Sequence, residues 1–462
     1  MEKSKSFQTV NPATGEILKT YQHLDASEIE RHLASAFVYY EKAKSKPVEL
    51  KAQQLRLLAQ ALRSHLPDLA QTMALEMGKS LKEAHLEIEK CAVTCDYFSE
   101  NLKTLMANEV VKSGYQQSYI AKDSLGPVLA IMPWNFPIWQ VIRFAAPAVG
   151  IGNPILLKHA DQTSGCAEML QKIFDQVEKG LFFNLRVDHD QISQIIADPR
   201  VRAVTLTGSA KAGQEIAAVA GKNLKKTVLE LGGSDAYVVF QDAQVVAAAQ
   251  VCAKARMVNN GQSCVAAKRF IVHKSVLNEF LKNFKLSVQS LKRGDPLNPL
   301  TDIGSLAGKR FQTQLLEQCA ELEKRGAEKI WDAAIEEKFD FQLPSAHFPP
   351  RIYKANKNEE AFFREELFGP VALIFDFESE EEALKLCNRS IYGLGGAVFS
   401  QDIERAQKFA RQMETGFVGI NDQVKSDVHL PFGGVKSSGY GRELSHFGFH
   451  EFCNIKSIGI GV

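Results

Sequence analysis

The segment between Gly126 and Gly233 alternates between two kinds of pattern, and this alternation constrains the fold more than any other feature of the sequence. Short apolar runs typical of strands are separated by stretches of helical length. The strands are predicted at 127–132, 154–158, 202–206 and 227–229, and the helices at 136–149, 164–179 and 209–220. Strands that alternate with helices form parallel β-α-β units. The pattern predicts a doubly wound parallel sheet, which binds nucleotides at the carboxyl ends of its strands.

A second alternating region runs from Ala236 to about Gly419, with strands predicted at 237–240, 269–273, 371–376 and 395–399. Residues 26–105 instead carry apolar side chains at helical spacing, and we expect mostly helices there. A chain of 462 residues with 45% hydrophobic content is too long for a single core. The sequence therefore predicts an α/β protein with at least two packed domains.

Charge and cysteine content narrow the class of partner. The 55 basic and 54 acidic residues nearly cancel, so no long-range field attracts nucleic acid or an anionic membrane. The N-terminus lacks the pattern of a secretory leader, and the longest apolar stretch, 144–157, is shorter than the roughly 20 residues that cross a bilayer. The eight cysteines follow neither a disulfide framework nor metal-site spacing. We expect a cytoplasmic protein that acts on a small molecule and binds no metal, nucleic acid or membrane.

Cys264 is the candidate nucleophile. It ends the polar segment Asn259-Asn260-Gly261-Gln262-Ser263, which follows a helical run at 243–258. A structural cysteine is usually surrounded by apolar residues, whereas a reactive thiol needs access to substrate and to backbone N–H groups. On local sequence alone, an ordinary free thiol remains the alternative.

Glu230 and Asn135 are candidates for acid–base and electrostatic roles. Glu230 lies at the end of an apolar strand before two glycines, where burial would raise its pKa toward the range of a general base. Its alternative role is an ion pair with Lys225 or Lys226. Asn135 precedes Phe136-Pro137, so it could cap the next helix or direct its amide toward a developing oxyanion.

The segment Thr207-Gly208-Ser209-Ala210-Lys211-Ala212-Gly213 joins a predicted strand to a predicted helix. Such a junction offers backbone N–H groups and a positive helix end to a phosphate. It does not match the G-x-G-x-x-G fingerprint, because four residues separate its two glycines. The segment alone is therefore a weak signal.

Six motifs occur together, and in this order they resemble those of the aldehyde dehydrogenase superfamily over essentially the whole chain. They are Pro133-Trp134-Asn135-Phe136-Pro137, Leu206-Thr207-Gly208-Ser209, Leu229-Glu230-Leu231-Gly232-Gly233, Gly261-Gln262-Ser263-Cys264, Glu366-Leu367-Phe368-Gly369-Pro370 and Pro431-Phe432-Gly433-Gly434. The resemblance implies a dinucleotide-binding domain (1–112 and 125–232), a catalytic α/β domain (233–430) and a small β oligomerisation element (113–124 and 445–462). The polar strand near 116–122 and the terminal strand 455–462 both need a pairing partner. We expect a homodimer or homotetramer, which could supply it.

The resemblance implies that Cys264 is the nucleophile, that Glu230 is the base and that Asn135 stabilises the oxyanion together with the Cys264 backbone N–H. The implied reaction oxidises an aldehyde to a carboxylic acid through a thioester while NAD(P) is reduced. Glu230 argues for hydrolysis of the thioester, because CoA-acylating members of the family lack this glutamate. A non-catalytic structural protein of the same fold is the alternative from another class.

The cofactor contacts are also implied by the resemblance. Lys158 and Asp161 would meet the adenosine ribose, Ser209 the phosphates, and Glu366 the nicotinamide ribose, with Phe368 beside it. The other predicted cofactor residues are Trp134, Gly208 and Gly213. An acidic Asp161 accepts hydrogen bonds from ribose hydroxyls and repels a 2′-phosphate, so NAD is favoured, although NADP is possible.

Substrate recognition is predicted around Arg143. Gln140 and Arg143 fall on one helix face, and an arginine in so apolar a segment needs either an internal ion pair or a substrate carboxylate. In the later segment 422–427, Ser426 could donate to that carboxylate and Asp427 could orient Arg143. These features look most like the bacterial succinate semialdehyde dehydrogenases. Glutarate semialdehyde and uncharged or aromatic aldehydes are the alternative substrates.

Overall fold

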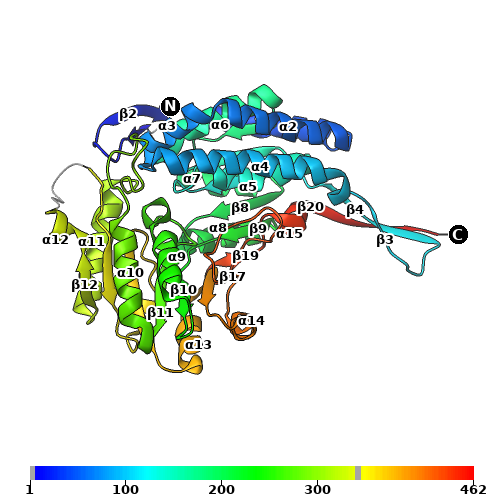
Figure 1. The fold of residues 1–462 in the computed structure, drawn as a ribbon. Coiled ribbons are helices and arrows are strands. Elements are labelled where there is room, and N and C mark those ends of the chain that lie inside the picture. The colour runs from blue at the N-terminus through cyan, green and yellow to red at the C-terminus, as the bar shows by residue number, and fades with distance from the viewer. Residues whose placement is uncertain (1–5, 339–344, 462) are drawn as a thin grey trace.

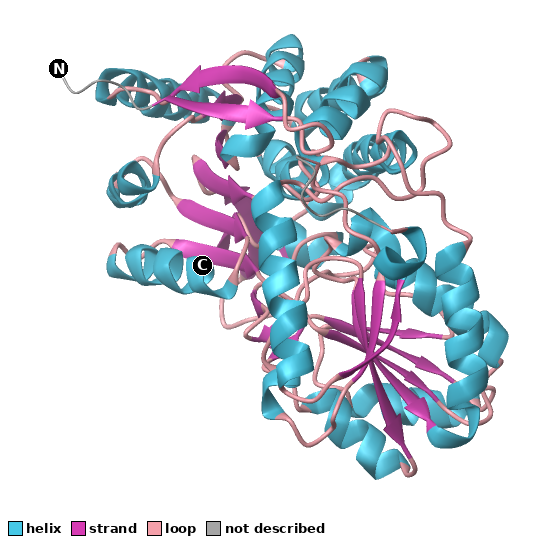
Figure 2. Cartoon of the chain, turned by 90° about the vertical axis from the view of Figure 1, so that its left-hand side faces the viewer, coloured by secondary structure: helices cyan, strands magenta, loops and turns pink. Residues whose placement is uncertain are grey.

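The computed structural model describes residues 6–338 and 345–461 (Figure 1). The fold is α/β, as predicted, and contains two large sheets that helices cover on both faces. Figure 2 looks onto the second of these sheets, whose strands fan out between flanking helices. A narrow β-arm projects away from both sheets and carries the C-terminal end of the chain at its tip (Figure 1).

The first sheet has six strands in the order β19-β9-β8-β5-β6-β7. Its strands are parallel except for the edge strand β19. Their bounds are β5 Val128–Met132, β6 Ile155–His159, β7 Phe182–Asn184, β8 Ala203–Thr207, β9 Lys226–Glu230 and β19 Gly439–Tyr440. The four predicted strands are confirmed to within a residue or two, whereas β7 and β19 were not predicted.

Side chains of this sheet alternate between two cores, which is why helices cover both faces. Val128, Ala130 and Met132 of β5 pack with the helices of one core, and Leu129 packs with those of the other. The helices are α1 Ala26–Ala43, α2 Val48–Ser64, α3 Leu66–Met77, α4 Leu81–Leu105, α5 Trp139–Ile151, α6 Ser164–Val177, α7 His189–Ala197 and α8 Ala210–Lys222. The helical prediction for 26–105 is confirmed.

Helix α5 begins three residues later than predicted, and a buried carboxylate explains the shift. Glu87 Oε1 of α4 accepts hydrogen bonds from the backbone N–H groups of Ile138 (3.0 Å) and Trp139 (2.9 Å). These groups would otherwise lack a partner at the start of the helix. The turn before Ile138 is thereby left free to carry Asn135 outside the helix.

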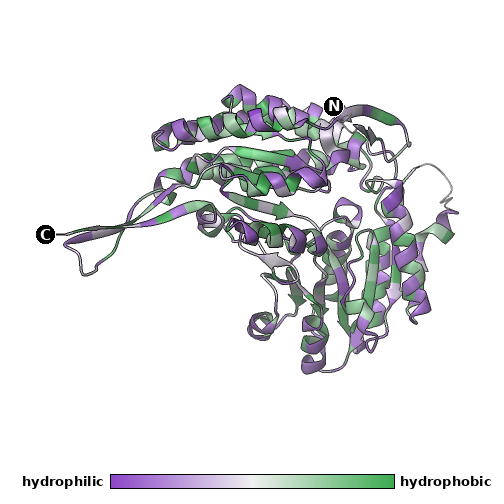
Figure 3. Cartoon of the chain, turned by 180° about the vertical axis from the view of Figure 1, so that it is seen from behind, coloured by the Kyte–Doolittle hydropathy of each residue, from purple (hydrophilic) through white to green (hydrophobic). Residues whose placement is uncertain are grey.

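The second sheet has seven strands in the order β12-β13-β14-β11-β10-β16-β17, and only β12 is antiparallel to its neighbour. Its strands are β10 Asp235–Val239, β11 Ala267–His273, β12 Glu328–Asp332, β13 Arg351–Lys354, β14 Val371–Phe377, β16 Gly395–Phe399 and β17 Phe417–Ile420. The helices around it are α9 Val245–Met257, α10 Leu277–Gln289, α11 Lys309–Lys324, α12 Ala333–Glu337, α13 Glu380–Asn388 and α14 Ile403–Gln412. Hydrophobic residues predominate along the central strands (Figure 3).

Smaller elements connect these layers. A hairpin of β1 Ser6–Val10 and β2 Ile17–Gln22 opens the described chain, and β15 Tyr392–Gly393 pairs with β18 Val435–Lys436. The 3-10 turns are η1 Asp161–Thr163, η2 Val258–Gly261, η3 Lys274–Val276 and η4 Glu360–Phe363. Within the described part of the chain, no helix is both long and apolar enough to cross a membrane.

The projecting arm consists of β3 Glu109–Val110, β4 Gln117–Ser124 and β20 Cys453–Ile460, in the order β20-β4-β3. Strands β4 and β20 pair antiparallel along their full length. The two strands that the sequence left unpaired therefore pair with each other within one chain. Helix α15 Ser445–His450 lies outside the arm and packs against α5.

Candidate active site

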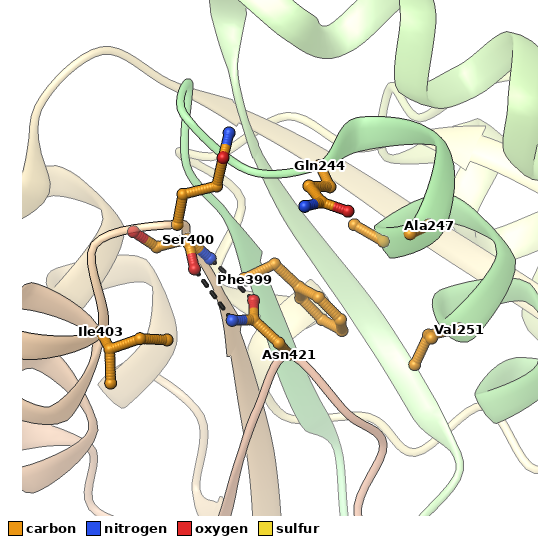
Figure 4. A pocket seen from close by; sticks show the side chains of 9 residues that line it. Gln244, Ala247, Val251, Phe399, Ser400, Ile403 and Asn421 are labelled. Atoms are coloured by element: carbon orange, nitrogen blue, oxygen red, sulfur yellow. Dashed lines mark hydrogen bonds between the residues drawn. The ribbon is translucent and has the colours of Figure 1, made fainter.

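Two cavities in the molecule differ in the chemistry that they could support. The first, of about 390 Å³, lies between α9 and the segments that follow β16 and β17 (Figure 4). Its lining contains no cysteine, histidine or charged side chain; Gln244, Ser400 and Asn421 supply its side-chain polarity together with Gln401. The second, of about 420 Å³, includes Cys264 in its wall. Only the second cavity of this pair has a thiol in its wall.

The second cavity brings together eight of the residues predicted from the sequence: Trp134, Asn135, Gln140, Gly208, Ser209, Cys264, Glu366 and Phe368. Several of them follow the carboxyl ends of β5 and β8, where a doubly wound sheet binds its ligand, and Leu231 and Gly232 line the cavity after β9. The remaining predicted residues, Lys158, Asp161, Gly213, Glu230, Arg143, Ser426 and Asp427, do not line this cavity.

The loop before Cys264 has an unusual backbone. Asn259, Asn260 and Gly261 all have left-handed φ values, of 50°, 55° and 74°. Asparagine and glycine tolerate this region best, and a Cβ at Gly261 would lie 2.4 Å from the Gly369 backbone. Lys268 then anchors the loop, because its Nζ donates to the Cys264 carbonyl at 2.7 Å. The loop presents Cys264, partly exposed, to the cavity.

The Cys264 thiol is neutral in this environment. Burial raises its pKa to about 12, and the charges of Glu366 and Glu230 act in the same direction. Arg143 and Lys268 oppose this effect, since a positive charge favours the thiolate. Nucleophilic attack by Cys264 therefore needs a base that accepts its proton.

Glu230 ends β9 and is buried, and neither of its carboxylate oxygens has a hydrogen-bond partner. Burial raises its pKa well above the ordinary value, the Glu443 carboxylate raises it further, and the Arg143 charge lowers it. The proposed pairing with Lys225 or Lys226 is wrong: Lys226 pairs with Glu451 at 2.9 Å, and Lys225 donates to backbone carbonyls. Glu230 is thus a buried carboxylate suited to accept a proton.

Asn135 is oriented by the nucleophile loop. Its Nδ2 donates to the Gln262 carbonyl at 3.1 Å, and its own backbone carbonyl accepts from Asn259 Nδ2 at 2.7 Å. The capping alternative is wrong, because Ile138 is the cap residue of α5 and Asn135 makes no hydrogen bond to the helix start. An amide nitrogen carries two hydrogens, so one remains for an oxyanion formed beside Cys264.

The β8–α8 junction supplies groups suited to a phosphate. Gly208 and Ser209 line the cavity at the N-terminus of α8, and Ser209 Oγ accepts from the Ala212 N–H at 3.2 Å. Gly213 has a packing role instead, because a Cβ there would lie 2.6 Å from the Leu231 side chain. The helix end carries a partial positive charge that favours an anion.

Glu366 also lines the cavity. Its Oε1 accepts from the Gly233 N–H at 3.1 Å and lies 3.1 Å from Lys268 Nζ. Phe368 packs edge-on against Trp134, with 5.7 Å between ring centroids. Lys268 was not predicted from the sequence, although it contacts both Cys264 and Glu366.

Lys158 and Asp161 lie at and just after the end of β6. Lys158 Nζ donates to Asp161 Oδ1 at 2.8 Å and to the His159 carbonyl at 2.9 Å. The Asp161 side chain is 46% exposed, so its carboxylate can also reach a ligand. The carboxylates of Asp161 and Glu366 can accept hydrogen bonds from ribose hydroxyls, and the N-terminus of α8 can donate to a phosphate. A dinucleotide cofactor requires groups of both kinds.

Arg143 is fully buried one turn after Gln140, and it forms an ion pair with Glu443. Its guanidinium also lies 4.6 Å from the centre of the Phe432 ring. Glu443 lies nine residues after the Pro431-Phe432-Gly433-Gly434 motif. This acidic residue was not considered from the sequence as a partner for Arg143. An internal partner for Arg143 was one of the two alternatives, and the structure identifies it as Glu443.

The prediction that Asp427 orients Arg143 is wrong. Asp427 accepts hydrogen bonds from the backbone N–H and Nδ1 of His429, at 2.9 and 2.8 Å, because the loop turns back on itself. Ser426 instead accepts from Lys90 Nζ at 2.6 Å. Lys90, in the middle of α4, was also missed, since nothing in its local sequence places it beside a loop more than 300 positions away.

Comparison with known proteins gives the family. The Aldehyde dehydrogenase family model matches residues 1–458. The chain is 41% identical to a probable NADP(+) succinate-semialdehyde dehydrogenase of Synechocystis sp., over 98% of this chain and 99% of that protein. It is 39% identical to the NAD(P)+ succinate semialdehyde dehydrogenase of Escherichia coli, over 97% of each chain. The crystal structure of succinic semialdehyde dehydrogenase from Streptococcus pyogenes with NADP+ matches with a TM-score of 0.95 and 36% identity, over 99% and 100% of the two chains. The chain belongs to the aldehyde dehydrogenase family.

Proposed function

We propose that this protein oxidises succinate semialdehyde to the carboxylic acid and reduces NAD(P) in the same reaction. The observation that carries the proposal is a cavity lined by Cys264, Asn135 and the N-terminus of α8, with the buried Glu230 carboxylate close enough to act on the Cys264 thiol. Two positive charges close to each other, Arg143 and Lys90, favour an aldehyde that also carries a carboxylate. Two similar proteins, at 41% and 39% identity, bear the name of succinate semialdehyde dehydrogenase.

Cys264 carries the first half of the reaction. Its thiol passes its proton to a water molecule, and from there to solvent, as sulfur attacks the aldehyde carbon. Asn135 Nδ2 and the Cys264 backbone N–H stabilise the resulting oxyanion. A nicotinamide cofactor, when bound, supplies the acceptor for the hydride that then leaves this carbon. A thioester on Cys264 remains.

Glu230 carries the second half. Its carboxylate accepts a proton from a water molecule, whose oxygen attacks the thioester carbon and releases the acid and the free thiol. Water supplies the second oxygen of the product. The absence of hydrogen-bond partners at Glu230 supports this role, because a carboxylate already held by lysine would be a weaker base.

The cofactor proposal is NAD as the preferred acceptor, with NADP also accepted. The Asp161 carboxylate disfavours a 2′-phosphate, whereas Lys158 beside it would attract one. The relatives named above are described with NADP(+) or NAD(P)+. The preference for NAD over NADP therefore depends on whether repulsion of a 2′-phosphate by Asp161 outweighs its attraction by Lys158.

The decisive experiment measures initial rates of reduced-nicotinamide formation with succinate semialdehyde, glutarate semialdehyde and butanal, each with NAD and with NADP. We expect the highest kcat/KM with succinate semialdehyde and NAD. Equal kcat/KM for the acidic aldehydes and butanal would leave an aldehyde dehydrogenase but contradict the substrate proposal. Activity that survives complete alkylation of Cys264 by iodoacetamide would contradict the covalent mechanism.

We also propose that the protein forms a homodimer or homotetramer in the cytoplasm. In the described part of the chain, β20 has no neighbour along its outer edge, and Ile455 and Ile460 are exposed on it. Such an edge favours association with a second copy. All eight cysteines are free thiols, as in a reducing compartment. Light scattering at micromolar concentration tests assembly, and a purely monomeric species would contradict it.

A further inference from the structure

Lys90 occupies a position that the reaction outlined above does not explain. It lies on α4, half-buried, facing α5 and the loop that carries Ser426. Its Nζ donates to Ser426 Oγ at 2.6 Å and lies 4.2 Å from the centre of the Trp139 ring. Among the described residues, no carboxylate lies within ion-pair distance of this ammonium group. Lys90 is thus a positive charge with polar and aromatic contacts but no counter-ion.

The charged groups around Lys90 are engaged elsewhere. Glu87, on the same helix, pairs with Lys79 and also accepts two backbone N–H groups. Asp427 bonds to His429, and Arg143 of α5 pairs with Glu443. The Lys90 charge is therefore the one in this cluster that lacks an acidic contact.

Desolvation makes this arrangement unfavourable without an anion. Burial and the nearby Arg143 charge lower the pKa of Lys90 to about 8, although Cys91, Glu87 and Asp427 act in the opposite direction. Two positive groups that lie close together in a partly buried site repel each other. A ligand carboxylate between Lys90 and Arg143 would offset this repulsion.

Two hydrogen-bond donors are available for such a carboxylate. Ser426 Oγ accepts from Lys90, so its own hydrogen is free to donate. Arg143 Nη2 is buried without a hydrogen-bond partner, which is costly unless an acceptor arrives. Gln140 on the same helix lines the cavity with Cys264, and the Arg143 charge acts on the Cys264 thiol. The cluster therefore lies behind the cavity lining, next to Gln140, and close enough for the Arg143 charge to act on the nucleophile.

We propose that Lys90 is a specificity-determining residue: its ammonium group binds the remote carboxylate of the aldehyde, together with the Ser426 hydroxyl and Arg143. The inference rests on the proposed function, because it assigns the charge recognition of that same substrate. The substrate carboxylate supplies the counter-ion that the folded chain lacks at Lys90. Uncharged aldehydes gain nothing from this contact.

Substitution of Lys90 tests the proposal. In Lys90→Met the apolar stem is kept and the charge is lost, so KM for succinate semialdehyde should rise about 10- to 100-fold, as expected for a lost charge-assisted hydrogen bond. The KM for butanal should change less than about 3-fold, because that substrate has no group for the ammonium to bind. Lys90→Arg should keep most of the preference. The matched control is Lys103→Met, at an exposed lysine of the same helix.

The pH dependence gives a second, independent readout. Lys90 binds an anion only when protonated, so KM for succinate semialdehyde should rise as the pH passes above about 8. Lys90→Arg should remove this rise, because arginine stays charged. Nearby groups do not imitate it: the pKa of Asp427 is lowered, mainly by hydrogen bonds from His429, and burial raises that of Cys91 well above its ordinary value. His429 is present in both the parent enzyme and Lys90→Arg, so any effect of its titration on KM is the same in the two proteins.

The outcomes separate the two proposals. A parent enzyme that does not prefer the acidic aldehyde over butanal contradicts the proposed substrate. A parent that does prefer it, with a Lys90→Met variant that retains the preference, overturns the role of Lys90 alone. Equal losses with both aldehydes, or a pH response that persists in Lys90→Arg, would also overturn it, since they would indicate a structural role. Thermal unfolding of each variant identifies a misfolded protein.

Discussion

The two sides of the catalytic cavity are built in different ways. On the cofactor side, short contiguous segments at strand ends supply the groups, as Gly208 and Ser209 do after β8. On the proposed substrate side, the charges lie behind the cavity lining and come from residues far apart in sequence: Arg143 pairs with Glu443, and Lys90 contacts Ser426. If the proposed roles are correct, cofactor binding is encoded locally, whereas the choice of aldehyde depends on tertiary packing. Variants can test whether this division holds.

Cys264, the proposed nucleophile, would react with the aldehyde whichever substrate or cofactor is bound. Its loss should therefore lower activity more than any other change. Cys264→Ser should lower kcat by at least about 1,000-fold with every aldehyde, because a hydroxyl is a far weaker nucleophile than a thiolate. Dinucleotide binding, measured by fluorescence titration, should persist. Substantial residual turnover would contradict the covalent mechanism.

Glu230→Gln should separate the two halves of the reaction. We expect a burst of reduced cofactor close to one equivalent per site, followed by turnover about 100-fold slower, since the thioester forms but water is no longer activated. In the parent, burial raises the Glu230 pKa, so turnover should rise with pH as the carboxylate ionises. That rise should vanish in Glu230→Gln. Stopped-flow absorbance over a pH series measures both effects, and an unchanged pH profile would exclude Glu230 as the base.

Arg143→Leu tests the substrate side. KM for succinate semialdehyde should rise about 100-fold, with a much smaller change for butanal. The variant should also lose about 3 kcal/mol of unfolding free energy, because Glu443 is left buried without its partner. The double variant Arg143→Leu/Glu443→Leu should recover stability without recovering recognition of the acid. Recovery of both would assign Arg143 a purely structural role.

Asp161→Ser tests the cofactor side and should have the smallest effect. Loss of the carboxylate frees Lys158 for a 2′-phosphate, so KM for NADP should fall about 5- to 10-fold. Because Asp161 is partly exposed, the unfolding free energy should change by less than about 0.5 kcal/mol. A stability loss as large as that of Arg143→Leu would contradict the contrast between the two sides. Steady-state kinetics and denaturant titration measure the two quantities.

The same contrast explains what the sequence could predict. The strand predicted at 202–206 is β8 Ala203–Thr207, because a buried strand between two helices is encoded by its own apolar run. Cys264 and Asn135 were assigned from contiguous motifs that resemble a family, Gln140 from its helix face, and all three line the cavity. Glu443 and Lys90 were missed, and Asp427 was wrongly assigned, because a loop's direction and a charge's partner depend on distant packing. The late start of α5 has the same origin, since Glu87 belongs to another helix.

The pairing of β4 with β20 also has a consequence for synthesis. Lys456 and Asp123, which form an ion pair across these strands, are 333 positions apart in sequence. At typical translation speeds, β4 leaves the ribosome on the order of half a minute before its partner strand. The arm therefore closes only after both large sheets have been translated. A ribosome product that stops before residue 453 lacks β20, so its β4 strand has no partner within the chain on that edge.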